Sequence, residues 1–266
     1  MGRLNEKISI VTGAARKSGI GFGIARKFAE EGSTVILVDI METIKDRKAD
    51  LIKMGFQAEA YVVDLTILQD VKKFVADVCE KYQKVDILCN CAGKSIPPRP
   101  KFVDMTEKYF DTVMARNLKT TVICCKAVVP VMIKNQYGKI INISSITGTR
   151  TAYRYSTAYA ASKGAVSGFT RALALEIGND NINVNAILPG LIDVDEVPWS
   201  PENDKWDMLK TPEENKWPIN KPGFPEDIGN LACFLASDES RHITGEEIVI
   251  DGGSILLEPS VPKFSF

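Results

Sequence analysis

A tyrosine and a lysine four residues apart, Tyr159 and Lys163, are well suited by type and spacing to move a proton. On a helix, residues at positions i and i+4 share a face, so these two side chains would stack. An isolated phenol has a pKa of about 10, and a neighbouring ammonium favours the phenolate and lowers that value. The spacing predicts a proton donor and acceptor for an alcohol or carbonyl oxygen, although an ordinary helix-surface pair has the same spacing.

Ser145 is a second candidate, because it directly follows a short apolar run. Residues 139–143 are predicted to form a strand, which places Ser145 at its carboxyl end. Ligands of doubly wound parallel sheets bind at the carboxyl ends of the strands. The sequence therefore predicts that Ser145 lies in a ligand-binding region.

A glycine cluster near the N-terminus predicts a phosphate-binding turn. The first predicted strand leads into Thr12-Gly13-Ala14-Ala15-Arg16-Lys17-Ser18-Gly19-Ile20-Gly21. Glycines let the backbone turn sharply and approach a pyrophosphate, while the first N–H groups of the following helix point at the anion. A tight strand-to-helix turn would need similar residues, but the position between a strand and a helix favours dinucleotide binding.

Asp39 favours NAD over NADP. It ends the second predicted strand, 18 residues after Gly21, where an acidic residue accepts hydrogen bonds from the adenosine ribose. Its charge would repel a 2′-phosphate, at a cost of up to about 4 kcal/mol for contact near a surface. Arg16 and Lys17 act in the opposite sense, because they could neutralise that phosphate, or they could simply be solvated. We expect NAD as the cofactor, with NADP the alternative.

Short β-branched runs alternate with longer amphipathic stretches along the chain. The runs predict strands at 8–11, 35–38, 60–63, 85–89, 139–143, 183–188 and 247–250. The amphipathic stretches predict helices at 20–31, 44–54, 68–82, 107–114, 121–134, 156–176 and 226–236, with a kink or early end at Pro130. This alternation predicts an α/β Rossmann fold with a doubly wound parallel sheet of about seven strands.

Residues 1–266 are predicted to form one domain, because neither an internal repeat nor a low-complexity linker divides them. The segment 193–223 interrupts the pattern, since it is polar and proline-rich and contains Trp199, Trp206 and Trp217. Insertions of this length in a compact domain are usually functional. We expect a lid over the substrate.

Composition argues against several other classes of protein. The formal net charge of -1 provides no basic field for nucleic acid. No apolar run is long enough to span a membrane, and we expect no signal peptide, because the apolar stretch after residue 6 is too short for one. Six cysteines lack the C-x-x-C spacing, and His242 is the single histidine, so we expect no metal. These features predict a cytoplasmic protein with reduced cysteines and a small-molecule substrate.

Taken together, these motifs resemble the short-chain dehydrogenase/reductase family, and the resemblance covers nearly the whole chain. Asn90-Cys91-Ala92-Gly93, Pro189-Gly190 and Asp251-Gly252-Gly253 match further family motifs in the family's order. The resemblance implies that Tyr159 is the general acid/base and that Ser145 hydrogen-bonds the reacting oxygen. It also implies that Lys163 lowers the Tyr159 pKa and binds the nicotinamide ribose, and that Asn117 holds a proton-relaying water.

Most of the predicted cofactor contacts are implied by the same resemblance. They are Gly13, Arg16, Ser18, Gly19, Ile20, Gly21, Asp39, Asp64, Leu65, Asn90, Ala92, Gly93, Tyr159, Lys163, Pro189, Gly190 and Ile192. Five residues separate Gly13 from Gly19, two more than is usual in the family, so a wider loop is expected around Arg16 to Ser18. Val194 occupies a position where the family often has threonine, which predicts that this contact is lost or moved.

Two loops expected to border the reaction centre, 94–101 and 149–155, are rich in cations. Guanidinium groups suit carboxylate, phosphate or sulfonate groups, so an anionic hydroxy or oxo substrate is one hypothesis. Solvated charges at the rim are the alternative, and the tryptophans also allow sugar-like or steroid substrates. The predicted substrate contacts are Lys94, Arg99, Arg150, Arg154, Tyr155, Trp199 and Trp206.

The predicted reaction interconverts a secondary alcohol and a ketone, or a primary alcohol and an aldehyde, by hydride transfer. Enoyl reduction is an alternative, but enoyl reductases of this superfamily space the tyrosine and lysine more widely than four residues. A non-catalytic NAD-sensing protein is another alternative, although such a protein would usually have lost part of the tetrad. The resemblance also implies a homotetramer, or a homodimer, built through helices 121–134 and 156–176.

Overall fold

One parallel sheet runs through the molecule. The computed structural model describes residues 2–194, 218–219 and 221–256. Its strands are β1 (Ile8–Thr12), β2 (Thr34–Asp39), β3 (Ala58–Val62), β4 (Ile87–Asn90), β5 (Gly138–Ile143), β6 (Ile182–Pro189) and β7 (Glu247–Ile250). They lie in the order β3-β2-β1-β4-β5-β6-β7, and all neighbouring strands are parallel. The predicted Rossmann fold is therefore confirmed.

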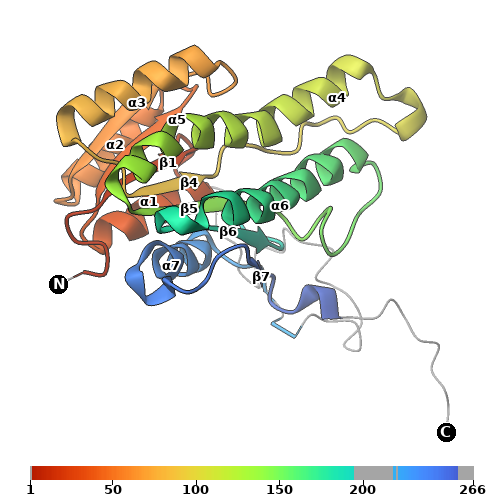
Figure 1. Cartoon of the computed structure of the whole chain (residues 1–266). Coiled ribbons are helices and arrows are strands. Elements are labelled where there is room, and N and C mark those ends of the chain that lie inside the picture. The colour runs from red at the N-terminus through yellow and green to blue at the C-terminus, as the bar shows by residue number, and fades with distance from the viewer. Residues whose placement is uncertain (1, 195–217, 220, 257–266) are drawn as a thin grey trace, which may run out of the picture.

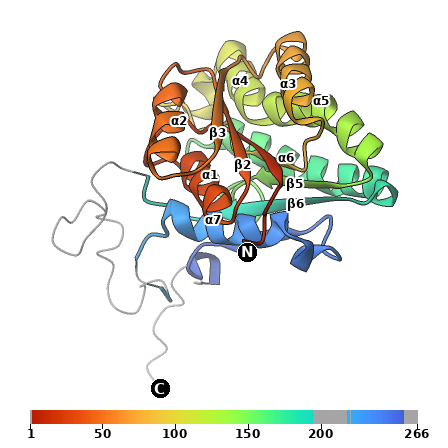
Figure 2. The ribbon, with the colours of Figure 1, turned by 90° about the vertical axis from the view of Figure 1, so that its left-hand side faces the viewer.

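Helices cover both faces of this sheet (Figures 1 and 2). One face is covered by α1 (Ile20–Glu30), α2 (Ile44–Lys53) and α7 (Pro225–Ala236). The other is covered by α3 (Leu68–Tyr82), α5 (Thr120–Asn135) and α6 (Thr157–Ile177). Helix α4 (Glu107–Met114) extends from α5 beyond the sheet, together with the loop that precedes it (Figure 1).

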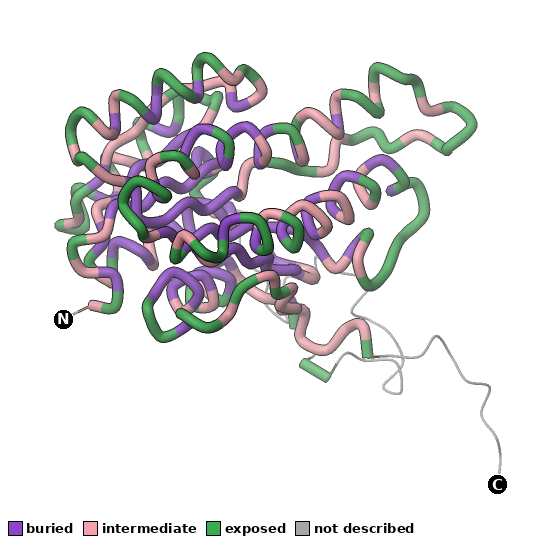
Figure 3. Tube along the Cα trace, viewed as in Figure 1, coloured by how far each residue is buried: buried purple, intermediate pink, exposed green. Residues whose placement is uncertain are grey.

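Alternation along the strands divides the interior into two apolar cores. In β2, Val35 and Leu37 belong to the core under α1, α2 and α7, whereas Ile36 and Val38 belong to the opposite core. Successive side chains of a strand point to opposite faces, so a strand covered on both sides must be apolar throughout. Buried residues accordingly concentrate in the sheet and in the helix faces turned toward it (Figure 3).

The strand order reverses beside β1, which lies between β2 and β4. Such a reversal opens a crevice at the carboxyl ends of the strands, where ligands of this class of sheet bind. The glycine cluster follows β1, and the Asn90–Gly93 motif begins at the end of β4. The two motifs are therefore neighbours at the crevice.

The polypeptide between α4 and α5 differs from the prediction. Residues Ala115–Lys119 form a π-helical turn that joins the two helices, so the expected break between 114 and 121 is wrong. The helix also continues past Pro130 to Asn135, so the expected early end there is wrong. Val128 and Met132 on either side of Pro130 are buried, and this packing offsets the cost of a proline inside the helix.

The two ends of the segment 193–223 lie side by side. The Asp193 N–H donates to the Gly223 carbonyl oxygen at 2.8 Å, and the Gly223 N–H donates to Leu191 at 3.0 Å. Residues 195–217, which include the three tryptophans, lie outside the described residues, so the lid stays a prediction. Within the described part of the chain, no helix is long and apolar enough to cross a membrane.

Candidate active site

The glycine cluster forms a turn in which several backbones approach closely. Gly13 has a φ of +70°, and a Cβ atom there would lie 2.7 Å from the Cα atom of Ala92. A Cβ atom at Gly21 would lie 2.4 Å from the Gly13 carbonyl oxygen. Helix α1 begins directly after Gly19, without a side-chain cap or an acidic residue in its first turn. The turn therefore presents backbone N–H groups and a helix N-terminus to an anion.

Hydrogen bonds hold the segment between Gly13 and Gly19 in place, and the expected widening of the loop around Arg16 to Ser18 stays a prediction. The Gly19 N–H closes the turn by donating to the Arg16 carbonyl oxygen at 3.0 Å. The Ser18 hydroxyl donates to the Val194 carbonyl oxygen at 2.5 Å. Ser18 was predicted to bind the cofactor, and the structure engages its hydroxyl with the start of the segment 193–223.

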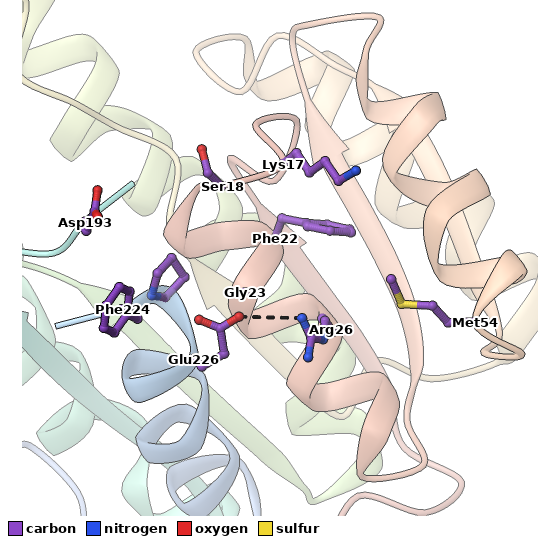
Figure 4. Close-up of a pocket in the computed structure, with 10 residues that line it drawn as sticks. Lys17, Ser18, Phe22, Gly23, Arg26, Met54, Asp193, Phe224 and Glu226 are labelled. Carbon is purple, nitrogen blue, oxygen red and sulfur yellow. Dashed lines mark ion pairs between the residues drawn. The ribbon is translucent and has the colours of Figure 1, made fainter. Parts of the chain in front are cut away.

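A pocket of about 200 Å³ lies against the outer side of the same turn (Figure 4). Its floor holds the ion pair between Arg26 and Glu226, at 3.5 Å. None of the four predicted catalytic side chains lines it, so it is not the reaction site. The lining residues are Lys17, Ser18, Phe22, Gly23, Arg26, Met54, Asp193, Phe224, Pro225 and Glu226.

Asp39 is held in place at the end of β2. One carboxylate oxygen accepts the Ala15 N–H and the other accepts the Met41 N–H, both at 3.1 Å. Each oxygen keeps a further lone pair. The carboxylate is therefore oriented by backbone groups and can still accept hydrogen bonds from ribose hydroxyls.

Further predicted cofactor contacts lie at the ends of β3 and β4. The Asp64 carboxylate is engaged within its own loop, where it accepts the N–H and the hydroxyl of Thr66 at 2.9 and 2.7 Å. Leu65 is buried. The Thr12 hydroxyl oxygen accepts the N–H groups of Cys91 and Ala92 at 3.0 and 3.1 Å, and this ties the loop after β4 to the end of β1.

Tyr159 meets Ser145 where β5 and α6 come together. Burial raises the pKa of the Tyr159 phenol to about 12, and a side-chain hydrogen bond with Ser145 opposes that rise. The Ser145 oxygen also accepts the Thr147 N–H at 3.1 Å, which fixes the serine in the loop after β5. The two hydroxyl groups therefore form one small polar site at the carboxyl edge of the sheet.

Lys163 lies one helical turn beyond Tyr159 and is almost fully buried, with 4% of its surface exposed. Its ammonium lies 5.9 Å from the centre of the Tyr159 ring and donates to the Ile143 carbonyl oxygen at 2.7 Å. Burial lowers the pKa of Lys163 to about 8. The expected lowering of the Tyr159 pKa by Lys163 is not seen: burial raises the pKa of the phenol, and Ser145 rather than Lys163 opposes that rise.

Asn117 lies in the π-helical turn and is fully buried. Its amide nitrogen donates to the carbonyl oxygens of Val113 and Lys94, at 2.9 and 3.2 Å. Its Oδ1 atom has no hydrogen-bond partner, and a Cβ atom at Gly93 would lie 2.6 Å from it. An unpartnered buried acceptor beside a glycine needs a hydrogen-bond donor, such as a water molecule.

Pro189, Gly190 and Ile192 carry the chain from β6 to the edge of the crevice. The Gly190 N–H donates to the Ile250 carbonyl oxygen at 3.0 Å, and a Cβ atom at Gly190 would lie 2.5 Å from that of Asp251. Ile192 is buried. The Asp251-Gly252-Gly253 turn therefore packs directly against the Pro189-Gly190 turn.

The predicted substrate contacts fall into three groups. Lys94, Arg99, Arg154 and Tyr155 are exposed on the two loops that reach the catalytic residues. Arg150 instead pairs with the carboxylate of Glu247 at 3.5 Å, so its charge is matched within the protein rather than by a substrate. Trp199 and Trp206 lie outside the described residues.

Asn142 and Thr170 support the site, although neither is among the residues predicted from the sequence. Asn90 donates to the Oδ1 atom of Asn142 at 2.9 Å, and Asn142 donates to the Thr170 hydroxyl at 2.9 Å. This buried chain links β4, β5 and α6 beneath the catalytic pair. A single asparagine in the apolar run Ile140–Ile143 was the available signal, and Thr12 and Glu247 offered none.

Comparisons with known proteins agree with this arrangement. Residues 13–254 match a family described as enoyl-(acyl carrier protein) reductase. Oxidoreductase UcpA of Salmonella typhimurium is 38% identical over 261 residues, covering 97% of this chain and 98% of that protein. The 3-oxoacyl-[acyl-carrier-protein] reductase FabG of Thermotoga maritima is 38% identical over 258 residues, covering 96% and 100%.

Two further relatives extend the comparison. An NAD-dependent glycerol dehydrogenase of Listeria innocua is 36% identical over 252 residues, covering 94% of each chain. A solved structure from Burkholderia xenovorans, provisionally described as a short-chain dehydrogenase/reductase, is 34% identical with a TM-score of 0.86, and covers 97% of this chain and 99% of that one. The chain belongs to the short-chain dehydrogenase/reductase family of nicotinamide-dependent oxidoreductases.

Proposed function

We propose that this enzyme uses NAD(H) to interconvert a secondary alcohol and a ketone, or a primary alcohol and an aldehyde. The observation that carries the proposal is the position of the Tyr159 hydroxyl, which lies close enough to Ser145 for the serine to lower its pKa and one helical turn from the buried Lys163. These groups lie at the carboxyl edge of the sheet, beside the glycine turn.

Tyr159 and Ser145 together bind the reacting oxygen. A phenol with a pKa of about 12 keeps its proton at neutral pH, so it can donate that proton to a carbonyl oxygen as negative charge develops there. The Ser145 hydroxyl stabilises the same oxygen with a second hydrogen bond. In the reverse direction the phenolate would accept the alcohol proton.

Lys163 and Asn117 support this proton transfer. At pH 7 a lysine with a pKa of about 8 is charged, and a positive charge one turn away favours the phenolate formed when Tyr159 gives up its proton. The unpartnered Oδ1 atom of Asn117 can hold a water molecule through which the phenolate is reprotonated.

The crevice fits a nicotinamide dinucleotide. The Gly13 turn and the start of α1 suit a pyrophosphate, Asp39 suits a ribose, and Lys163 suits the second ribose. When bound, the nicotinamide supplies or accepts the hydride that accompanies the proton of Tyr159.

Asp39 supports NAD rather than NADP. Its carboxylate is fixed by two backbone N–H groups, so it cannot easily turn away from a 2′-phosphate. We expect kcat/KM with NADH to exceed that with NADPH by at least about ten-fold, which corresponds to only part of the roughly 4 kcal/mol of a like-charge contact. An Asp39→Ser variant should narrow the difference. A preference for NADPH in the unchanged enzyme would overturn the assignment.

Enoyl reduction is the second candidate, because the matching family carries that description. The four-residue separation of Tyr159 and Lys163 on one helix favours carbonyl reduction instead. A matched pair of thioesters, acetoacetyl and crotonyl, separates the two reactions in an NADH absorbance assay. Faster reduction of the crotonyl thioester would favour the enoyl reaction. Tight NADH binding without turnover of any alcohol or carbonyl compound would favour an NAD-sensing protein.

A further inference from the structure

The loop 94–101 is attached directly to the catalytic machinery. The amide nitrogen of Asn117 donates to the Lys94 carbonyl oxygen at 3.2 Å, and the Tyr109 hydroxyl of α4 donates to the Ile96 carbonyl oxygen at 2.7 Å. Helix α4 packs in turn against α6, which carries Tyr159. These contacts fix the loop at both its catalytic end and its middle.

Tyr153 is attached to the start of α6 in a similar way. The Ser156 hydroxyl donates to the Tyr153 carbonyl oxygen at 2.5 Å, and the Tyr153 N–H donates back to the Ser156 oxygen at 3.4 Å. Ser156 directly precedes α6, and Tyr159 lies in the first turn of that helix. Tyr153 is therefore attached to the end of α6 that carries Tyr159, with 42% of its surface exposed.

Arg99 connects these two attachments. Its guanidinium carbon lies 4.8 Å from the centre of the Tyr153 ring, a cation–π contact between the loops that follow β4 and β5. Among the described residues, no carboxylate pairs with Arg99, whereas Arg150 is paired with Glu247. A cation–π contact uses no N–H group of the guanidinium for a carboxylate, so these donors stay available for a planar oxyanion.

We infer that Arg99, held on the ring of Tyr153, binds a carboxylate of the substrate and makes this enzyme selective for oxo or hydroxy carboxylic acids. The inference rests on the proposed alcohol–ketone reaction and specifies its substrate class. A guanidinium can bind a carboxylate through two parallel hydrogen bonds, and this geometry requires a fixed plane. Contact with the Tyr153 ring restrains the guanidinium on one side.

The experiment compares acids with their methyl esters as substrates for NADH-dependent reduction. Suitable pairs are pyruvate with methyl pyruvate and acetoacetate with methyl acetoacetate, and 2,3-butanedione serves as a neutral probe. The unchanged enzyme should prefer the acid in at least one pair. In Arg99→Gln, the acid-to-ester ratio of kcat/KM should fall by about 10- to 100-fold, mainly through KM for the acid.

Three variants make the result specific. Arg99→Lys keeps the charge but loses the planar fork, so it should restore only part of the preference. Tyr153→Leu removes the ring and should lower the preference, whereas Tyr153→Phe keeps the ring and should retain it. Lys108→Gln removes an exposed cation of α4 and is the matched control, which should leave the acid-to-ester ratio unchanged.

Three outcomes would overturn the inference. One is unchanged kcat/KM for both acid and ester in Arg99→Gln, and another is an equal fall of kcat/KM for both, which would show that Arg99 only supports the loop. The third is a preference of the unchanged enzyme for the esters, or for phosphorylated rather than carboxylated ketones. Failure of the proposed function is distinct, because neither 2,3-butanedione nor any of the pairs would then be reduced.

Discussion

Burial acts on both members of the catalytic pair and favours the neutral form of each. It raises the pKa of Tyr159 to about 12 and lowers that of Lys163 to about 8. At pH 7 the tyrosine is therefore a neutral acid and the lysine is an ammonium in an apolar setting. Such a charge is useful for catalysis but costs stability.

Replacing Lys163 by methionine should stabilise the fold at pH 7. A pKa of about 8, against 10.5 for an exposed lysine, means that the buried ammonium costs about 3 kcal/mol. The variant also lacks the hydrogen bond from Lys163 to Ile143, which costs it about 1 kcal/mol of stability. The free energy of unfolding should therefore rise by about 2 kcal/mol in total. Urea unfolding at pH 7 measures it, and turnover should be lost in the same variant.

The pH dependence of that gain has a definite sign. Between pH 8 and 10.5 the unfolded chain binds the Lys163 proton and the folded chain does not, so the wild type gains stability as pH rises. The advantage of Lys163→Met should therefore shrink over this range. Lys53→Met, at an exposed position, controls for the loss of a surface lysine. A constant advantage at both pH values, or a less stable variant at pH 7, would contradict the burial argument.

At the scale of elements, Asn117 lies in the π-helical turn Ala115–Lys119, and its side chain contacts the loop after β4. The loop approaches so closely that only glycine fits at position 93, where φ is +142° and a Cβ atom would lie 2.6 Å from Asn117 Oδ1. Single π-helical turns are rare in proteins overall, but many of them occur at functional sites. This one directs the Asn117 side chain toward the loop.

A Gly93→Ala substitution should therefore lower turnover as well as stability. Gly55 is the matched control, because it also has a positive φ, of +90°, but a Cβ atom added there would have no neighbour within 4 Å. Both variants should lose about 1 to 3 kcal/mol of stability from backbone strain, and Gly93→Ala should lose more than Gly55→Ala because its added Cβ atom also meets Asn117. Only Gly93→Ala should displace Asn117 and reduce kcat, by more than ten-fold. Equal kcat in the two variants would show that Asn117 is not positioned by this contact.

The type of most elements is predictable from the sequence, because most strands are short apolar runs and most helices repeat their apolar residues with a helical period. The π-helical turn was not, since no glycine or proline marks residues 115–119 and the turn is set by packing around Asn117. The β3 strand was placed two residues late, at 60–63 rather than 58–62, because only one of its residues, Ala58, is buried.

Some features of the candidate site are likewise predictable from the sequence, and others are not. Gly13, Asp39, Ser145, Tyr159 and Lys163 were predictable, because their positions follow from motif order and from the carboxyl edge of a parallel sheet. The partner of Arg150 was not, since Glu247 lies almost one hundred residues further along the chain. Long-range pairing of exposed arginines depends on tertiary structure that no local pattern encodes.

For the molecule as a whole, the two long helices α5 and α6 leave apolar side chains on the surface. Leu175 of α6 is 87% exposed and Ile133 of α5 is 36% exposed. We propose that these helices form the interface of a homotetramer. Light scattering should then give a mass about four times 29.3 kDa.

A charge at Leu175 tests that assembly. Leu175→Asp should lower the mass, because a buried unpaired carboxylate opposes association. Met54→Asp, at a half-exposed apolar position on the opposite face of the sheet, should leave the mass unchanged. A dimeric mass would limit the interface to one helix pair, and a monomeric mass at all concentrations would contradict the proposal.

The central claim is that Tyr159 transfers the proton while the rest of the crevice holds the nicotinamide cofactor. The most direct measurement combines NADH-dependent turnover with NADH binding in Tyr159→Phe, which removes only the hydroxyl oxygen. We predict that carbonyl reduction falls by at least about 10²-fold, while the dissociation constant for NADH changes by less than about three-fold. Near-normal turnover in the variant would contradict the claim.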